Sequence, residues 1–182
     1  MTDATTNKRR EKFEEERASD QFAWDSIREG SDLGAVDART LIHLGRKRAK
    51  RDLYDWANRV ADKFWDVHRR HKNGEDVPRE FGGYGVRIIE QGWTVTIQWY
   101  FTKGRGGKLK PTMEGIKGPE GKTYRMPPSR FAQAKDWELE AISRAEDEFE
   151  VIRRCSEHLK SMTPPFLGYV QVLDEHERKR KA

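Results

Sequence analysis

The sequence has a single cysteine, Cys155, among 182 residues. This excludes an internal disulfide and also a cysteine cluster that would hold zinc or an iron–sulfur centre. Long apolar runs are missing too, since no stretch approaches the roughly 18 apolar residues of a membrane span, and the N-terminus lacks the apolar core of a signal peptide. We therefore expect a soluble protein of the reducing cytoplasm that has no contact with membranes.

Catalytic signatures are absent as well. The sequence contains no P-loop, no GxSxG, no HExxH, no pair of CxxC motifs and no GxGxxG after a strand. His68 and His71 have a spacing that can bring two imidazoles to one metal, but no third ligand is placed beside them. Residues 81–130 contain three acidic residues, too few for the carboxylate cluster of a metal-dependent nuclease. We predict a protein that is not an enzyme and needs no metal or cofactor.

Charged side chains, by contrast, are abundant. They make up 37% of the residues, and the formal net charge is +5. The charge is segmental, because residues 43–72 and 81–130 each carry a net +6 whereas residues 1–32 and 131–161 each carry −3. This pattern indicates a polarised surface, one side of which faces a polyanion.

The most regular pattern is a run that alternates between two sets of side chains. The apolar set consists of Trp93, Val95, Ile97, Trp99 and Phe101. Successive side chains on a strand point to opposite faces, so one face is predicted to be core and the other solvent-exposed. The interruption at residues 90–92 predicts a tight turn from a preceding strand. Residues 108–117 are predicted to form a third strand, weakened by Pro111, and residues 122–126 a fourth.

Two long helices are predicted to flank these strands. Apolar residues recur at three- and four-residue spacing from Leu53 to Val67, which predicts an amphipathic helix that ends at Asn73-Gly74. A second helix is predicted from Ser129, as its N-cap, to Ser161, with Pro164-Pro165 as the stop. The apolar seam of this second helix packs on the first helix or pairs with another subunit, and both alternatives stay open.

These elements predict an α+β fold, in which a small antiparallel meander of three to four strands packs against two long helices. An additional N-terminal helix is expected at residues 8–29. We predict a charged N-terminal tail and helix at residues 1–30, a single DNA-binding domain at residues 31–173 and a charged C-terminal tail at residues 174–182. Residues 166–173 are apolar enough to dock onto the domain.

A glycine-rich basic segment follows the alternating strand. Its basic residues, with those of the next strands, are Lys103, Arg105, Lys108, Lys110, Lys117, Lys122 and Arg125. A two-stranded ribbon can enter the major groove of DNA, where Arg105 or Arg125 would pair with guanine and Lys117 would contact a phosphate. The alternative is a hairpin tip that is merely solvated.

A second basic cluster lies near the start of the first long helix. It consists of Arg46, Lys47, Arg48, Lys50 and Arg51. On a helix these charges cover most of the circumference, so Asp52 and Asp55 cannot neutralise all of them. Such residues bind phosphates without reading sequence, although an ordinary solvated helix face is the alternative. The two basic regions together favour double-stranded DNA as a ligand.

Several local sequences resemble a known family. They are WTVTIQWYF at residues 93–101, GIKG at 115–118 and YRM at 124–126, followed by a helix that contains WELE at 137–140 and FEVIRR at 149–154. This arrangement resembles the MobI-type conjugative mobilisation proteins over about residues 84–161. The resemblance implies an auxiliary factor of integrative conjugative elements or large conjugative plasmids. Such a factor acts at the transfer origin with the relaxase and does not cut DNA itself.

If the resemblance holds, an acidic cluster becomes a candidate surface for the relaxase or another transfer protein. The cluster consists of Glu146, Asp147, Glu148 and Glu150. An ordinary solvated helix face is again the alternative. A homodimer is compatible with the apolar seam and with repeated sites at a transfer origin.

Two other functions compete with DNA binding. The first is a protein-binding adaptor or inhibitor from a phage or mobile element, which makes no contact with DNA. The second, RNA binding on the open face of the sheet, is disfavoured because that face offers mainly Thr and Gln, with Tyr100 alone to stack on a base. The DNA sequence recognised stays open.

Overall fold

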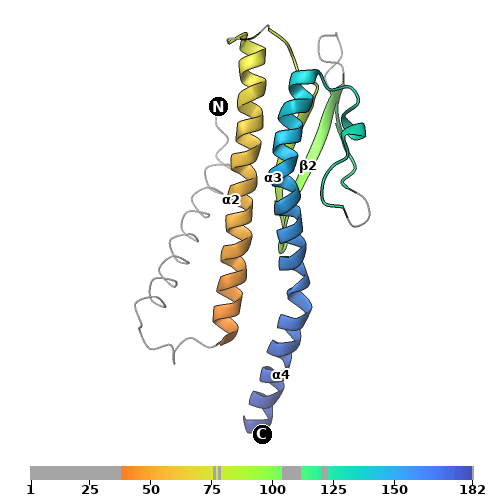
Figure 1. The fold of residues 1–182 in the computed structure, drawn as a ribbon. Helices are drawn as coiled ribbons and strands as arrows, with labels where there is room; N and C mark the ends of the chain where they lie inside the picture. The colour runs from red at the N-terminus through yellow and green to blue at the C-terminus, as the bar shows by residue number, and fades with distance from the viewer. Residues whose placement is uncertain (1–37, 76, 78, 104–111, 120–122, 182) are drawn as a thin grey trace. The chain divides into compact units, whose positions relative to one another are not determined.

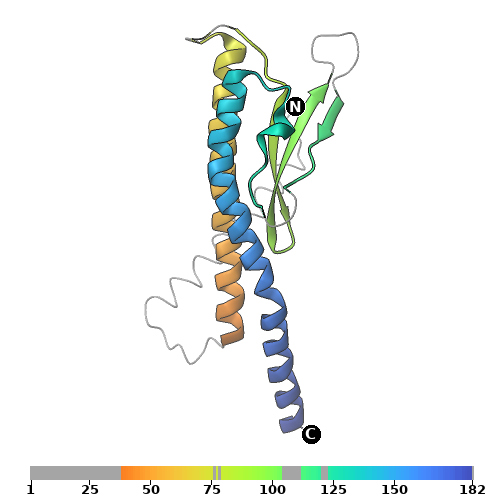
Figure 2. The ribbon, with the colours of Figure 1, turned by 45° about the vertical axis from the view of Figure 1, so that its right-hand side comes forward.

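A computed structural model describes residues 38–75, 77, 79–103, 112–119 and 123–181 of the chain. The chain divides between Arg46 and Lys47 into two units, and the second unit, Lys47–Ala182, contains the sheet and its core. In this unit a three-stranded antiparallel sheet of order β1-β2-β3 is covered on one face by two long helices (Figures 1 and 2). The predicted α+β class is confirmed. The helix expected at residues 8–29 lies outside the described residues.

The sheet is built on the predicted hairpin. β1 (Tyr84–Gln91) pairs antiparallel along its whole length with residues 94–101 of β2 (Thr94–Lys103), and a two-residue loop joins the strands. Gly92 in this loop has a φ of +54°, in the left-handed region that favours glycine. Trp93 lies beside it in the turn, so the expectation that it belongs to the strand was wrong by one residue.

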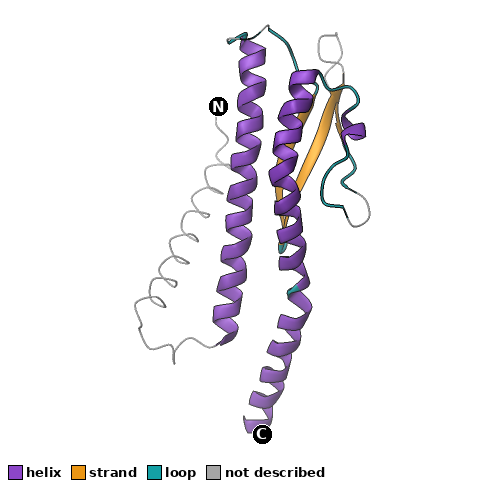
Figure 3. Ribbon diagram, in the orientation of Figure 1, coloured by secondary structure: helices purple, strands orange, loops and turns teal. Residues whose placement is uncertain are grey.

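The faces of the sheet follow the alternation of the sequence. Val95, Ile97 and Trp99 are buried, and the polar residues between them face away from the helices. β3 (Thr112–Gly115) pairs with residues 100–103 of β2. Residues 123–126 form no strand, so the sheet has three strands among the described residues and the fourth strand expected there was wrong. Figure 3 shows the sheet as a single layer beside the helices.

The first helix, α2 (Ala38–Asn73), ends where the sequence predicts. Gly74 has a φ of +74°, and its N–H donates to the carbonyl of His71 (3.3 Å). The N–H of Glu75 donates to the carbonyl of Arg70 (3.0 Å). These two bonds form a Schellman motif, which satisfies carbonyls that would otherwise lack a partner at the helix end.

The second long helix begins later than predicted. Residues 128–131 form a single 3₁₀ turn, and α3 (Asp136–Ser161) starts after it, so Ser129 is not the N-cap. The burial of Phe131 explains the difference, because its side chain is 2% exposed and fixes the turn against the core. Glu138 occupies the N3 position of α3, in the first turn, where the positive end of the helix dipole favours a carboxylate.

The chain continues as helix where the sequence predicts a stop. α3 ends at Ser161, but α4 (Thr163–Lys181) follows almost at once. Pro164 and Pro165 lie in the first turn of α4, where backbone N–H groups have no helical acceptor and proline is tolerated. Leu167 and Val172 are 60% and 65% exposed, so these side chains of the apolar segment are not docked as expected. No described helix is long and apolar enough to cross a membrane.

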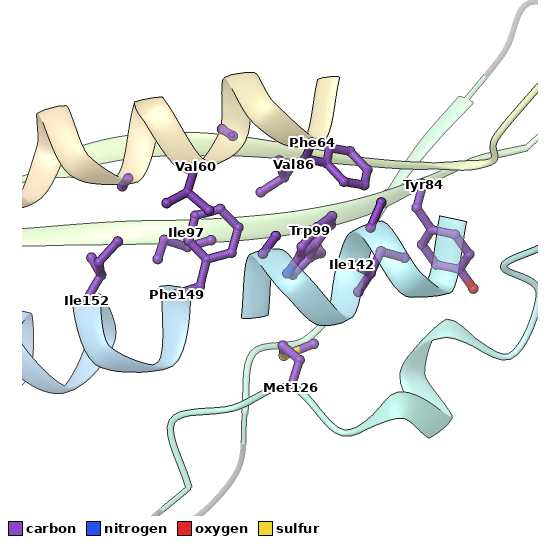
Figure 4. Close-up of a cluster of buried hydrophobic side chains, with 14 of the residues drawn as sticks. Val60, Phe64, Tyr84, Val86, Ile97, Trp99, Met126, Ile142, Phe149 and Ile152 are labelled. Carbon is purple, nitrogen blue, oxygen red and sulfur yellow. The ribbon is translucent and has the colours of Figure 1, made fainter. Parts of the chain in front are cut away.

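The core lies between the sheet and the two helices (Figure 4). Trp99 is at its centre, with edge-to-face ring contacts to Phe64 of α2, Phe131 of the 3₁₀ turn and Phe149 of α3. Other side chains of this core are Val60, Tyr84, Val86, Ile97, Met126, Ile142 and Ile152. A central aromatic residue therefore contacts both helices and the segment that precedes α3.

One charged group is buried inside this core. Glu146 of α3 is 1% exposed, and its carboxylate accepts hydrogen bonds from Trp99 Nε1 (2.7 Å) and from the backbone N–H of Met126 (2.7 Å). Both of its oxygens also accept from Arg153 (2.8 and 2.9 Å). The Arg153 guanidinium in turn donates to the carbonyl of Tyr124 (2.7 Å). The network joins β2, residues 124–126 and α3.

A second buried carboxylate joins the other end of α3 to the sheet and to α2. Glu138 is fully buried and accepts the backbone N–H of Tyr84 (2.8 Å). Its Oε1 lies 3.3 Å from Nε2 of His68, which is also buried. A Cβ atom on Gly82 would come within 2.3 Å of both side chains. Only glycine allows the chain to enter β1 so close to this pair.

We predict that Glu146→Ala strongly destabilises the fold. The substitution leaves two N–H groups buried without an acceptor and removes the carboxylate that neutralises the largely buried Arg153, which costs about 3–5 kcal/mol. Glu140→Ala on the same helix is the control, because Glu140 is exposed and pairs with Arg144 alone, a contact worth about 0.3–0.5 kcal/mol. Urea unfolding followed by tryptophan fluorescence measures both. Equal losses in the two variants would contradict a structural role for the buried network.

The pH dependence of stability provides a test of the Glu138 environment. Burial raises the pKa of Glu138 above its ordinary value, although backbone N–H groups oppose the shift. Between the ordinary and the raised pKa the folded protein holds a proton that the unfolded chain has lost. Stability therefore falls as the pH rises through this window, by at most about 1.4 kcal/mol per pH unit.

Glu138→Gln removes this titration and keeps an oxygen that accepts the N–H of Tyr84. The free energy of unfolding of the wild type minus that of the variant should fall as the pH rises from about 4. Urea unfolding from pH 4 upward measures the difference. A difference that rises with pH would show instead that the ionised carboxylate is stabilised in the fold, as in an ion pair with His68.

Candidate nucleic-acid interface

The basic residues predicted on α2 do not share one environment. Arg46 and Arg51 are buried, at 3% and 7% exposed. Lys50 lies against the β1–β2 hairpin, with its Nζ 2.7 Å from Glu90 Oε1 and in a hydrogen bond to the carbonyl of Gly92 (3.1 Å). These three cations are not presented as the exposed phosphate contacts that the sequence predicted.

The other two basic residues of the cluster lie nearer to solvent. Arg48 is exposed and forms an ion pair with Asp52 one turn later (3.1 Å), while Lys47 is half-buried. An exposed pair of this kind is weak and is exchanged easily for a phosphate. Phosphate binding by Lys47 and Arg48 therefore stays a prediction.

The hairpin set is only partly described. Lys103 is exposed at the end of β2 and forms an ion pair with Glu114 of β3. Lys117 is exposed just beyond β3. Arg105, Lys108, Lys110 and Lys122 lie outside the described residues, so their contact with DNA stays a prediction.

Arg125 is held against α3. Its guanidinium forms an ion pair with Asp147, donates to Ser143 Oγ (3.1 Å) and lies 3.9 Å from Glu150. The hydrogen bond to Asp147 raises the pKa of Arg125 further. A bidentate contact between Arg125 and guanine would require these bonds to be exchanged.

The acidic residues of α3 do not form the single partner surface that was expected. The assignment of Glu146 to that surface was wrong, because the residue is buried in the core network. Glu148 bridges to α2, accepting from Trp56 Nε1 (2.6 Å) and Lys63 Nζ (3.2 Å), contacts that lower its pKa. Asp147 and Glu150 face Arg125 on another side of the helix. These two alone remain together as a candidate partner site.

His68 and His71 do not converge on a metal site. His68 lies in the core beside Glu138, and His71 stacks on Trp137 with ring centroids 4.0 Å apart and an angle of 11°. The described part of the chain has no group of three or more metal-ligating side chains. Both imidazoles contribute packing contacts between α2 and the start of α3.

The structure reveals a groove that the sequence did not indicate. Two adjoining cavities of about 820 and 800 Å³ share Gly118, Thr123 and Tyr124 as walls. We call them together the basic groove. It runs between residues 118–119 and 123–130 on one wall and one side of α3 on the other, and it continues past Tyr124 to residues 94–97 of β2.

The network around Glu146 forms the base of the basic groove. Arg153 binds Glu146 on its inner side and the carbonyl of Tyr124 on its outer side, so it fixes the segment that forms one wall. Beyond Tyr124, Ser156 of α3 binds the backbone of Val95, accepting its N–H (2.9 Å) and donating to its carbonyl (3.4 Å). The groove is therefore built from elements that are bonded to one another.

Positive charge predominates along the basic groove. Five of its lining side chains are Lys or Arg and two are Glu. Arg125 and Arg153 are bound to carboxylates, and Lys160 lies 3.8 Å from Glu157. Arg154 is exposed and has no ion pair among the residues that the structure describes.

Sequence analysis missed Arg130, Arg154, His158 and Lys160. Arg154 and His158 lie one helical turn apart on α3, within a segment whose net charge is negative, so segment charges concealed them. Their four-residue spacing was the available signal, because residues four apart share a helix face. Arg130 is distant from them in sequence and lines the same cavity only in the folded chain.

The described part of the chain is thus an α+β domain with a groove lined mainly by cationic side chains. A family model described as MobI protein matches residues 53–164, more than half of the chain. The chain therefore belongs to the MobI protein family, as its resemblance predicted, and membership suggests a role in conjugative mobilisation. The match covers most of α2, the sheet, residues 116–135 and α3. No curated protein and no solved structure matches the chain.

Substitutions in the basic cluster of α2 test which of its cations stabilise the fold. Arg51→Ala removes a buried guanidinium and should lower the free energy of unfolding by about 1–3 kcal/mol. Arg48→Ala removes an exposed pair and should change it by less than about 0.5 kcal/mol. Thermal and urea unfolding of both variants measure the difference. A larger loss in the Arg48 variant would contradict these assignments.

Proposed function

We propose that the protein is a non-catalytic DNA-binding auxiliary factor for conjugative transfer, which acts in the cytoplasm at the transfer origin. It binds double-stranded origin DNA and helps to recruit or position the relaxase. Membership of the MobI family carries the proposal. The basic groove and the exposed cations at the end of β2 support it, because contacts to phosphates supply most of the affinity of such proteins.

The sheet suggests how duplex DNA is approached. Lys103 and Thr112 are the last described residues on either side of residues 104–111, and they are paired across β2 and β3. The ends of β2 and β3 that flank this segment are thus held side by side. A rigid pair of strands is a suitable support for a segment that contacts a DNA groove.

The exposed carboxylates of α3 are the candidate contact for a protein partner. Asp147 and Glu150 have side chains that are 65% and 45% exposed, and they lie beside Arg125. We propose them as the contact for a basic surface of the relaxase or of another transfer protein. Glu150 also lines the basic groove whereas Asp147 does not, so a substitution of Asp147 is the one that separates the partner role from binding in the groove.

A second candidate function is that of a protein-binding adaptor that makes no contact with DNA. The exposed apolar side chains of α4, Leu167 and Val172, favour it, because such side chains are suited to a protein interface. The two functions differ in their response to salt. A DNA-binding protein loses affinity steeply as salt increases, whereas an adaptor is indifferent to DNA.

The deciding experiment is a titration of labelled duplex DNA that carries the transfer origin of the parent element, across a salt series. We expect salt-sensitive binding by the wild type. A variant with Ala at Lys103, Arg105, Lys108 and Lys110 should bind more weakly and should have a shallower salt slope, by up to about 0.9 for each lost phosphate contact.

The matched control removes four exposed charges elsewhere, at Lys63, Arg69, Arg144 and Lys179. It should bind as the wild type does, once general electrostatic attraction is reduced by moderate salt. No binding of the wild type to any duplex at low salt would contradict the proposed function and favour the adaptor. Equal losses in the two variants would contradict a specific role for the end of the sheet.

A further inference from the structure

The shape of the basic groove favours a single nucleic-acid strand over a duplex. It is concave, and its floor and walls include the apolar surfaces of Met126, Pro127 and Pro128 beside cationic side chains. A duplex is a broad convex rod whose bases are stacked inside, so it would touch only the rim of such a groove. A single strand exposes both its bases and its phosphates, and it can lie within the groove.

The cations of the basic groove are placed to contact a phosphate backbone. Arg130 lies on the wall that includes residues 123–130, and Arg154 lies on the opposite wall formed by α3, with His158 one helical turn further along. Lys160 lies two residues beyond His158 on α3, in the second cavity. Cations on both walls and along the length of a groove match the linear charge of a nucleic-acid strand.

Tyr124 lies where the two cavities meet and lines both of them. Its carbonyl is fixed by Arg153, so the backbone at this position is held firmly. Among the described residues its phenol ring and hydroxyl have no ring contact or hydrogen bond. A half-buried ring with an anchored backbone and no other contact of this kind is suited to stack on a base.

We propose that the basic groove binds single-stranded DNA, with a base stacked on Tyr124 and the phosphates contacted by Arg154 and Arg130. The inference deepens the proposed function and rests on it, because it adds a single-strand site to a protein that binds origin DNA. The chemistry requires no sequence reading, since every base has a face that can stack. An auxiliary factor with this site holds an unpaired strand where the origin is opened.

The test uses fluorescently labelled oligo-dT of 12 nucleotides, which cannot form a duplex with itself. Arg154→Glu should weaken binding by about tenfold or more, because a phosphate contact becomes a repulsion. Tyr124→Ala should weaken it by about 5- to 150-fold, the range for loss of one aromatic stacking contact, while Tyr124→Phe retains the ring and should bind nearly as the wild type does. Unfolding curves of each variant confirm that the fold is retained.

Arg144→Glu is the matched control. It reverses an exposed arginine on the same helix, away from the basic groove and paired with Glu140. It should leave the affinity for oligo-dT within about twofold at moderate salt. In a second measurement, oligonucleotides that contain 5-iodouracil should cross-link to Tyr124, and mass spectrometry identifies the attachment site.

The outcomes distinguish this inference from the proposed function. Binding of the wild type to oligo-dT that is lost in Arg154→Glu and Tyr124→Ala, but retained in Arg144→Glu, supports the inference. Duplex binding without oligo-dT binding, or oligo-dT binding that is unchanged in both groove variants, overturns the inference and leaves the proposed function standing. Absence of binding to either DNA overturns both. Loss of relaxase capture in Arg154→Glu, with oligo-dT binding intact, makes the groove a protein site and overturns the inference.

Discussion

The fold of this protein depends on a carboxylate that is buried in its centre. Glu146 is buried beside Trp99 and Met126, where an unpaired charge would be very unfavourable. It is accommodated because each of its two oxygens has donors, one of which is the charged group of Arg153. These donors come from β2, from the segment before α3 and from α3 itself. A single group therefore determines how three parts of the chain meet.

The candidate site follows from this constraint. Residues 123–128 have no regular secondary structure, yet they lie in a defined place because Glu146 binds the backbone of Met126 and Arg153 binds that of Tyr124. The basic groove is the space that remains between this segment and α3. The position of the groove on the surface is thus a consequence of hydrogen bonds in the core. The exposed cations lie on walls whose backbone is held in place by these bonds.

The sequence predicted the elements whose periodicity is strong. The alternation in β2 and the apolar stripe of α2 both follow from the requirement to bury one face, and the Asn73-Gly74 signal has a direct conformational cause. The start of α3 was wrong because Phe131 is buried and no local signal reveals this. The stop at Pro164-Pro165 was wrong because proline also suits the first turn of a helix.

Site residues were predicted less well than the fold, for a related reason. Charge counts along the chain identify basic segments but not the partners that fold against them. Glu146 and Glu148 belong to the same acidic run, yet one is buried under Arg153 and the other binds Trp56 of α2. Arg154 was missed because it lies in an acidic segment. The network that distinguishes these residues is formed by parts of the chain that are distant in sequence.

The hydrogen bonds between Ser156 and Val95 have a consequence for the behaviour of the protein at high concentration. β3 pairs with only the last four residues of β2, and the first half of β2 has no neighbouring strand on that side among the described residues. A bare strand edge of this kind recruits strands from other molecules and leads to aggregation. Here a helix side chain satisfies the edge backbone at Val95 and α3 stands beside it. This part of the β2 edge is thereby less open to pairing with another strand, because a serine hydroxyl takes the place of a strand at Val95.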